Sequence, residues 1–138
     1  MIIGVPKEIK DYEYRVSLTP DGARVLLQGH RVVVEPSAGQ GSGFSDDAYR
    51  QAGVQVAGSK AEVFQQADLI VKVKEPQLSE CPLFRPGQVL FTYLHLASLP
   101  DLTKALVAAD ITAIAYETVE ARDHSLPMLR PMSEIAGR

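Results

Sequence analysis

Two cationic side chains, Lys74 and His95, lie at the carboxyl ends of apolar, β-favouring runs. Lys74 belongs to the segment 69–76 (LIVKVKEP), and His95 closes the segment 89–95 (VLFTYLH). Open parallel α/β sheets carry ligand-binding groups at this end of their strands, and Arg15 follows the first apolar run in the same way. Arginine binds carboxylates through two hydrogen bonds, lysine polarises carbonyl groups, and histidine transfers protons near neutral pH. Together the three predict a site for a small 2-oxo acid.

Arg15 and His95 also have purely structural interpretations. Arg15 follows Glu13 and can be an ordinary surface charge, as most arginines are. His95 lies between two leucines, and a lone histidine in an apolar segment is more often structural than catalytic. Its place directly after a buried strand favours a functional role. His30 follows a helix end and His124 lies in a polar turn, so we predict no chemistry for either.

Lys72 and Lys74 need to be distinguished from each other. They alternate around Val73 and therefore share one face of a strand, as they also would on a solvated edge strand. Glu75 precedes a proline and is held extended, which places Lys74 where the strand stops and the chain turns over the sheet edge. We therefore predict that Lys74 belongs to the site and that Lys72 is a bystander.

The glycine-rich segment 39–44 (GQGSGF) follows a strand and precedes a helix, as a dinucleotide-binding turn would. That fingerprint requires a third glycine where Phe44 stands, and the next strand, 54–56, has no acidic residue at its end. We predict a tight turn with positive φ angles instead. Glu8, Glu117 and Asp123 lack the paired spacing of a metal site, so no metal is predicted.

The composition is typical of one folded globular domain. The 138 residues suffice for a sizeable core, and a net charge of -3 without a basic stripe argues against nucleic acid or an anionic membrane as partner. No segment approaches the roughly 18 apolar residues of a membrane span, and no targeting signal is present. The single Cys81 allows neither a disulfide framework nor a zinc cluster. We expect a small-molecule ligand and a cytoplasmic location.

Six apolar runs, at 1–5, 31–35, 54–56, 69–73, 89–93 and 112–115, alternate with helix signals. Repeated βα units of this kind predict a mostly parallel sheet of about six strands flanked by helices. The expected fold is a single Rossmann-like (flavodoxin-like) α/β domain. No internal repeat or flexible linker divides the chain, so we place one domain over residues 1–138.

Polar residues mark the expected helix starts. The predicted N-caps are Thr19 for the helix through Gln28, Ser45 for one ending at Gly53, Ser59 with Glu62 for one through Ala67, and Ser98 for one through Ala109. Ser133, followed by an acidic residue, predicts a further helix over the last seven residues, 132–138. So short a helix is not stable alone, and we expect the chain to stop inside an element.

Several motifs occur in a characteristic order. They are GVPKE at 4–8 with Arg15-Val16 and Thr19-Pro20, Ala38-Gly39 with Gly41, KVKEP at 72–76, FTYLHL at 91–96, AYETV at 115–119 and PMSEIAGR at 131–138. Along essentially its whole length the chain resembles the N-terminal part of the bacterial alanine dehydrogenases. The related proton-translocating nicotinamide nucleotide transhydrogenases share the opening and the closing Ala-Gly, but their pattern lacks counterparts of His95 and Lys74. Alanine dehydrogenase is therefore the closer resemblance.

The resemblance implies a role for each candidate residue. Arg15 would clamp the substrate carboxylate, Lys74 would hydrogen-bond the pyruvate carbonyl oxygen, and His95 would be the acid/base. Tyr93 and Met132 would line the pocket. The implied reaction is the reversible conversion of L-alanine, NAD and water into pyruvate, ammonium and NADH. Positive charge beside the carbonyl oxygen is favourable because that oxygen gains negative charge. We expect Lys74 and His95 both to be essential, with their division of proton transfer left open.

The resemblance also implies that the chain is the N-terminal substrate-binding and catalytic domain of a two-domain enzyme. NAD would be bound mainly by a dinucleotide domain following Arg138, and this piece alone would be inactive. The full-length enzyme would be a homo-oligomer, a hexamer in the family, whereas the oligomeric state of the piece stays open. Two alternatives remain: a module that binds a small carboxylate without chemistry, and a transhydrogenase-like nucleotide-binding subunit.

Overall fold

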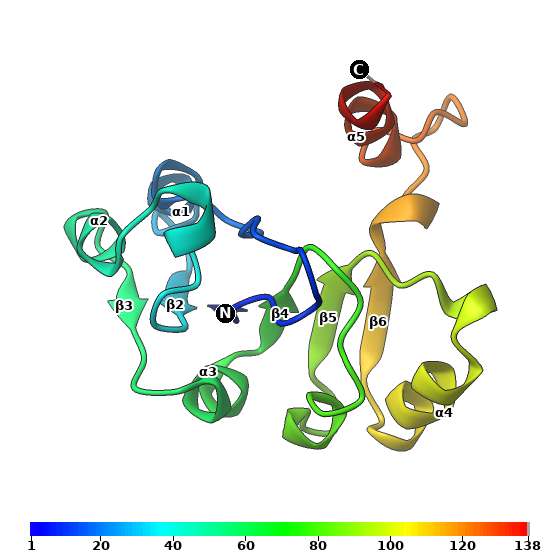
Figure 1. Ribbon diagram of the computed structural model, residues 1–138, viewed down its shortest axis with the longest axis horizontal. Coiled ribbons are helices and arrows are strands. Elements are labelled where there is room, and N and C mark those ends of the chain that lie inside the picture. The colour runs from blue at the N-terminus through cyan, green and yellow to red at the C-terminus, as the bar shows by residue number, and fades with distance from the viewer. Residues whose placement is uncertain (138) are drawn as a thin grey trace.

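The computed structural model describes residues 1–137, which form one parallel sheet with helices on both sides (Figure 1). The strands are β1 (Ile2–Val5), β2 (Arg31–Val34), β3 (Gln55–Val56), β4 (Leu69–Val71), β5 (Val89–Thr92) and β6 (Thr112–Ala115). The α-helices are α1 (Pro20–Leu26), α2 (Asp46–Gln51), α3 (Lys60–Gln66), α4 (Pro100–Ala108) and α5 (Leu129–Ala136). Four 3₁₀ turns are η1 (Gln40–Ser42), η2 (Cys81–Leu83), η3 (Leu96–Ser98) and η4 (Tyr116–Thr118). The predicted α/β fold and its six strands are confirmed.

The strand order β3-β2-β1-β4-β5-β6 places the first strand in the middle of the sheet. Every neighbouring pair is parallel, and Gly4 pairs with Val33 on one side and Ile70 on the other. The direction of winding reverses between β1 and β4. In open α/β sheets, ligands bind in the crevice beyond the carboxyl ends of the strands at such a reversal. A ligand site is therefore expected among the segments that follow β1, β4 and β5.

Alternating side chains of the strands build two cores on opposite faces of the sheet. Val32 and Val34 pack in one cluster with Ala23 of α1 and Tyr49 of α2. Val33, between them, packs on the other face in a cluster with residues of α3 and α4. This alternation is the period-two pattern of a pleated strand whose two faces are both buried. The central strands are therefore held rigidly from both sides.

Three of the predicted helix caps are confirmed. The side chains of Thr19, Ser45 and Ser59 accept hydrogen bonds from the backbone N–H groups of Gly22, Ala48 and Glu62, respectively. Each bond satisfies one of the N–H groups that the first turn of a helix leaves without an intrahelical partner. Glu62 also reaches back, but its carboxylate accepts the N–H of Gly58, one residue ahead of the cap.

Two predicted caps were wrong, and a proline explains each case. Pro100 is the first residue of α4, so Leu99 occupies the cap position and Ser98 lies one residue too early; its hydroxyl donates to the carbonyl of His95. α5 begins at Leu129, and Ser133 lies inside the helix. Pro131 lies in the first turn of the helix, where backbone N–H groups have no intrahelical partner. The missing N–H of proline therefore costs no hydrogen bond, and the helix can begin before Pro131. The predicted terminal residue, Arg138, lies outside the described residues.

Two surfaces of the domain are less covered than the rest. α5 stands away from the other helices, beyond the end of β6 (Figure 1). An apolar hollow of about 410 Å³ lies over β4, β5 and β6, lined by Leu69, Phe91 and Ile114 among others. Over residues 1–137, no helix has both the length and the apolar character needed to span a membrane.

Gly4 yields a prediction about stability. A methyl group at this position would lie 2.7 Å from the Cβ of Ala67 and 2.9 Å from a methyl of Val63, closer than side chains pack. We expect Gly4→Ala to lower the free energy of unfolding by about 1–3 kcal/mol, because it overpacks β1 against α3. Gly29→Ala is the matched control, since a methyl there would meet nothing within 4 Å. Urea denaturation followed by circular dichroism measures both, and equal midpoints would contradict the expectation.

Candidate active site

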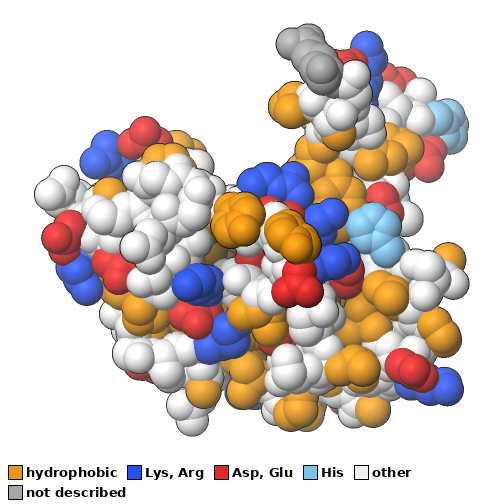
Figure 2. Space-filling view, in the orientation of Figure 1, with side chains coloured by type: hydrophobic (Ala, Val, Ile, Leu, Met, Phe, Trp, Pro, Cys, Tyr) orange, Lys and Arg blue, Asp and Glu red, His pale blue; other side chains and the backbone are white. Residues whose placement is uncertain are grey.

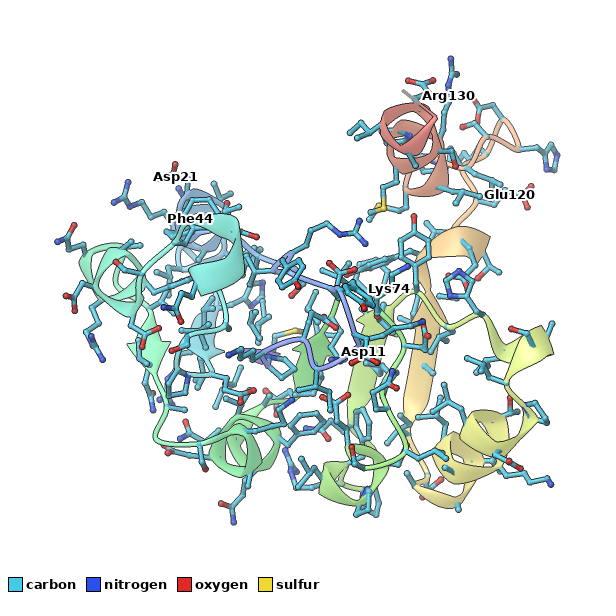
Figure 3. The ribbon with its side chains drawn as sticks, in the orientation of Figure 1. Asp11, Asp21, Phe44, Lys74, Glu120 and Arg130 are labelled. Atoms are coloured by element: carbon cyan, nitrogen blue, oxygen red, sulfur yellow. The ribbon has the colours of Figure 1, made fainter. Side chains whose placement is uncertain are left out.

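All five predicted site residues line one cavity. Its volume is about 260 Å³, and it is lined by Arg15, Lys74, Tyr93, His95, Leu129, Met132, Ser133 and Ala136. The first four come from the segments that follow β1, β4 and β5, and the others come from α5. Figure 3 shows Lys74 beyond the ends of the central strands, and Figure 2 shows basic and histidine side chains gathered in the hollow beneath α5. The sheet edge thus brings together residues up to 117 positions apart, from Arg15 to Met132.

Arg15 is oriented by Glu13. The Nε and Nη2 atoms of its guanidinium donate to the Glu13 carboxylate at 2.8 and 2.6 Å, and the Arg15 N–H donates to the same carboxylate at 3.0 Å. These hydrogen bonds hold the pKa of Glu13 below its usual value and raise the pKa of Arg15. Because a guanidinium carries five N–H donors, the Nη1 side can still bind a second carboxylate. Arg15 is therefore held in a fixed orientation by Glu13.

The glycine turn supports the loop that carries Arg15. The hydroxyl of Ser42 donates to the carbonyl of Tyr14 at 3.0 Å, and a methyl group on Gly41 would lie only 2.6 Å from that carbonyl oxygen. A methyl group on Gly39 would similarly lie 2.7 Å from the ring of Tyr49. The expected positive φ occurs at Gly43 alone, at 83°. Gly39 and Gly41 are required for close packing and not for a left-handed backbone.

Lys74 lies just beyond the end of β4, where side chains hold its backbone. The hydroxyl of Thr92 donates to the Lys74 carbonyl at 2.9 Å. Lys72 has a different environment: it is 1% exposed, and its ammonium lies 3.2 Å from Glu8 and 3.3 Å from Glu80. β4 is an interior strand between β1 and β5, so the solvated-edge interpretation of these lysines was wrong. Lys72 is buried and structural, and it does not line the cavity.

His95 is held by two carboxylates and an aromatic ring. Its backbone has a positive φ of 49°, and Glu117 accepts the N–H groups of His95 and Leu94 at 2.8 and 3.1 Å. The ring Nδ1 lies 3.4 Å from Glu75, and the ring stacks on Tyr93 with centroids 5.5 Å apart. With the Nδ1 proton directed at a carboxylate, Nε2 is the nitrogen left for a ligand. A positive φ is uncommon for a non-glycine residue, and the contacts with Glu117 and Tyr93 hold His95 in it.

Tyr93 connects the sheet edge to α5. Its hydroxyl donates to the sulfur of Met132 at 2.6 Å, and its ring meets Tyr116 edge to face. Burial raises the pKa of Tyr93, and the negative charge of Glu117 adds to this, so the hydroxyl stays protonated and remains a donor near neutral pH. Met132 and Leu129 of α5 thereby form an apolar wall opposite the polar residues of the sheet edge.

Four glutamates that support the site were not predicted from the sequence. Glu13, Glu75 and Glu117 contact Arg15 and His95, and Glu8 accepts the backbone N–H of Val73 at 2.7 Å. Glu8 and Glu117 were considered only as metal ligands, for which their spacing is wrong. A usable signal was available, since each lies after a strand or beside a predicted site residue.

The described residues contain no group of three or more His, Cys, Asp and Glu side chains placed to hold a metal ion.

The glycine turn departs from the dinucleotide-binding pattern. Its Gly39 and Gly41 pack closely against Tyr49 and Tyr14, and Phe44 stands where the fingerprint has a third glycine. His124 pairs with Glu120 on the surface, away from the cavity.

Comparison with known proteins agrees with the fold and the motifs. The family model described as "Alanine dehydrogenase/PNT, N-terminal domain" matches residues 4–136, so the chain belongs to this family. It is 57% identical to an alanine dehydrogenase of Methanococcus maripaludis and 52% identical to one of Halomonas elongata, in each case over the whole chain. The chain spans 37% and 38%, respectively, of the length of these relatives.

Solved structures give the same result. An L-alanine dehydrogenase superimposes on the whole chain with a TM-score of 0.96 and 52% identity, and the chain covers 38% of it. A transhydrogenase from Sinorhizobium meliloti matches 85% of the chain with a TM-score of 0.80 and 32% identity, and 35% of that chain is covered. The predicted resemblance to the alanine dehydrogenases is therefore confirmed.

Glu117 yields a prediction about pH. Burial acts to raise the pKa of this carboxyl, but hydrogen bonds from the backbone N–H groups of His95 and Leu94 outweigh burial and hold the pKa below its ordinary 4.5. A carboxyl with a lowered folded-state pKa stabilises the fold fully above its unfolded value and loses that effect as the pH falls through the folded value. We expect the stability difference between wild type and Glu117→Gln to be largest above pH 4.5 and to shrink below it. Urea denaturation at several pH values tests this, and a constant difference would contradict it.

Proposed function

We propose that the whole protein is an NAD-dependent L-alanine dehydrogenase and that this chain supplies the substrate-binding side of its active site. The observation that carries the proposal is the convergence of Arg15, Lys74 and His95 on one small cavity. The high identity to alanine dehydrogenases over the whole chain supports the same reaction. L-alanine, NAD and water would give pyruvate, ammonium, NADH and a proton, and the reaction would be reversible.

Each of the three cationic groups would act at a different part of the substrate. Arg15 would bind the carboxylate through its Nη1 side. Lys74 would donate a hydrogen bond to the oxygen on the adjacent carbon, which gains negative charge as the carbonyl group is attacked. His95 would exchange protons with the water and the carbinolamine intermediate through Nε2, since Nδ1 faces Glu75. Lys74 and His95 could exchange these last two roles, and we propose only that both are required.

NAD would be bound by the remainder of the protein. The glycine-rich turn departs from a dinucleotide cradle, because its Gly39 and Gly41 pack closely against Tyr49 and Tyr14. When bound by the remainder of the protein, NAD would supply the acceptor for the hydride that leaves the substrate carbon. The chain itself would bind and orient the substrate, and the apolar wall of Leu129 and Met132 would accommodate a methyl group. On this proposal the isolated chain would be inactive.

The decisive experiment is L-alanine-dependent reduction of NAD by the whole protein. We expect Lys74→Ala and His95→Ala each to lower kcat/KM by about 1,000-fold, because each removes a group that stabilises charge or moves a proton in the transition state. Lys104→Ala and His30→Ala are matched controls, since both residues are exposed and lie away from the cavity. Binding of pyruvate without any turnover by wild type would favour the carboxylate-binding module instead.

A second prediction concerns the turn that supports Arg15. Gly41→Ala would push the Tyr14 carbonyl and displace the arginine that follows it. We expect KM for L-alanine to rise about tenfold with a smaller change in kcat, because the carboxylate contact is lost mainly in binding. The control is Gly43→Ala in the same turn, which introduces backbone strain at a φ of 83° but meets no atom within 4 Å. Steady-state kinetics of both variants decide, and an unchanged KM in Gly41→Ala would count against the role of the turn.

A further inference from the structure

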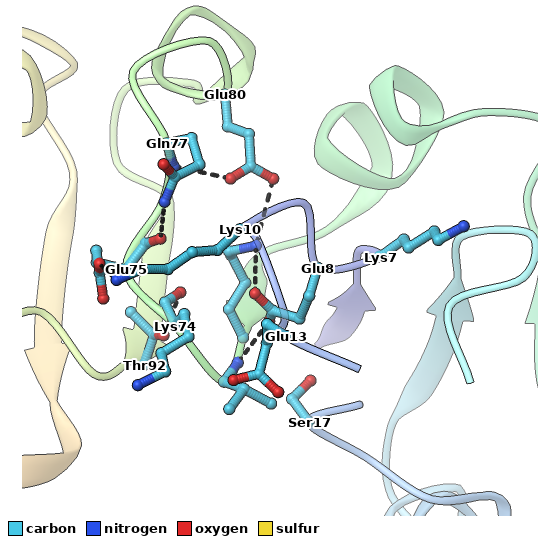
Figure 4. A network of polar contacts seen from close by, with 12 residues as sticks. Lys7, Glu8, Lys10, Glu13, Ser17, Lys74, Glu75, Gln77, Glu80 and Thr92 are labelled. Atoms are coloured by element: carbon cyan, nitrogen blue, oxygen red, sulfur yellow. Dashed lines mark hydrogen bonds and ion pairs between the residues drawn. The ribbon is translucent and has the colours of Figure 1, made fainter. Parts of the chain in front are cut away.

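A cluster of buried charges lies behind the candidate active site. Lys72 is 1% exposed, and the side chains of Glu8 and Glu80 beside it are 3% and 2% exposed. Lys60 adds a second cation, with its ammonium 2.9 Å from Glu80. Figure 4 shows Glu8 and Glu80 converging on this cluster from the segments after β1 and β4. None of the four residues lines the cavity that contains Lys74.

Stability alone does not account for such a cluster. Removing two charges from water costs several kcal/mol per ion, and well-packed apolar residues of similar volume are often equally or more stable. Burial accordingly raises the pKa of Glu8, and the charge of Lys72 opposes that rise. The buried charges are better explained by the backbone groups that their hydrogen bonds hold in place.

The contacts of the cluster lead to the backbone that carries Lys74. One oxygen of Glu8 pairs with the Lys72 ammonium, and the other accepts the Val73 N–H at 2.7 Å. Tyr116 donates to the Lys72 carbonyl at 2.8 Å, and Thr92 donates to the Lys74 carbonyl at 2.9 Å. β4 ends at Val71, but Lys72 still donates to the Phe91 carbonyl and the Val73 carbonyl still accepts from Tyr93, so this backbone stays paired with the β5 segment. The side chains of Glu8, Tyr116 and Thr92 add to that pairing, and Glu8 is the acceptor for the Val73 N–H. Among them, Glu8 alone is charged.

We propose that Glu8, balanced by Lys72, is a positioning residue that fixes Lys74 for the reaction through its hydrogen bond to the Val73 N–H. The inference rests on the proposed function, because the position of Lys74 affects turnover only if Lys74 takes part in the reaction. Neither Glu8 nor Lys72 lines the cavity proposed to hold the substrate. Lys72 supplies the counter-charge, and Glu8 makes the contact that places the backbone.

Two double variants of the whole protein separate positioning from stability. Glu8→Gln with Lys72→Met removes both charges but keeps a carbonyl oxygen that can accept the Val73 N–H. Glu8→Leu with Lys72→Met removes both charges and that acceptor. Both avoid an unpaired charge inside the protein, and thermal unfolding establishes a temperature at which both are folded. Comparing them isolates a single hydrogen bond.

We expect the glutamine variant to retain kcat for L-alanine within about threefold of wild type, and the leucine variant to lose about 100-fold in kcat, as displacements near 1 Å do. KM should change by less than about threefold in both variants, because Arg15 is not disturbed. Equal kcat values in the two folded variants would overturn the proposal, since a merely structural role predicts no difference between them.

Hydrogen exchange measured by mass spectrometry gives a second readout that does not need activity. Peptides spanning residues 72–75 should stay protected in wild type and in the glutamine variant, and should exchange at least about tenfold faster in the leucine variant. Equal protection in both variants would overturn the placement by Glu8. If wild type does not oxidise L-alanine, the proposed function fails, and the exchange comparison still decides whether Glu8 positions this backbone.

Discussion

Each cationic residue of the site is held by a glutamate. Glu13 holds Arg15 through its guanidinium, Glu8 holds the backbone before Lys74, and Glu75 and Glu117 hold His95. Arg15 and Lys74 bring two positive charges to one small cavity, and the carboxylates around them offset the repulsion between these charges. The carboxylates also accept backbone N–H groups beyond the strand ends, where no sheet partner exists. The same interaction therefore balances the charge and fixes the geometry.

The sheet explains why these groups meet. β1 lies in the middle of the sheet beside β4, so the segments after β1, β4 and β5 leave the same edge next to one another. Both faces of the central strands are packed, which makes this edge rigid. Gly4 contributes directly, because its missing side chain lets α3 approach β1 closely. A rigid edge allows a few hydrogen bonds to define the position of each polar group.

Local signals were sufficient for most of the fold. Apolar runs identified all six strands, and Thr19, Ser45 and Ser59 identified three helix starts, because caps and strand patterns depend on neighbouring residues. The prediction failed where a proline outweighed a serine, as at Pro100 and Pro131. It also missed the burial of Lys72. Lysines that alternate along a strand look the same on an interior and an edge strand, and only the strand order distinguishes the two.

The site could be predicted in part for the same reason. Arg15, Lys74 and His95 follow strand ends, which the sequence reveals. Glu13 lies two residues from Arg15, whereas Glu75, Glu117 and Glu8 act across 20 to 65 residues of chain. The apolar wall also depends on a contact between distant residues, since α5 stands apart and is joined to the polar edge by the hydrogen bond from Tyr93 to Met132. The polar half of the cavity is thus built on the sheet and its apolar half on a projecting helix. The width of the cavity is consequently set by the position of that single helix relative to Tyr93.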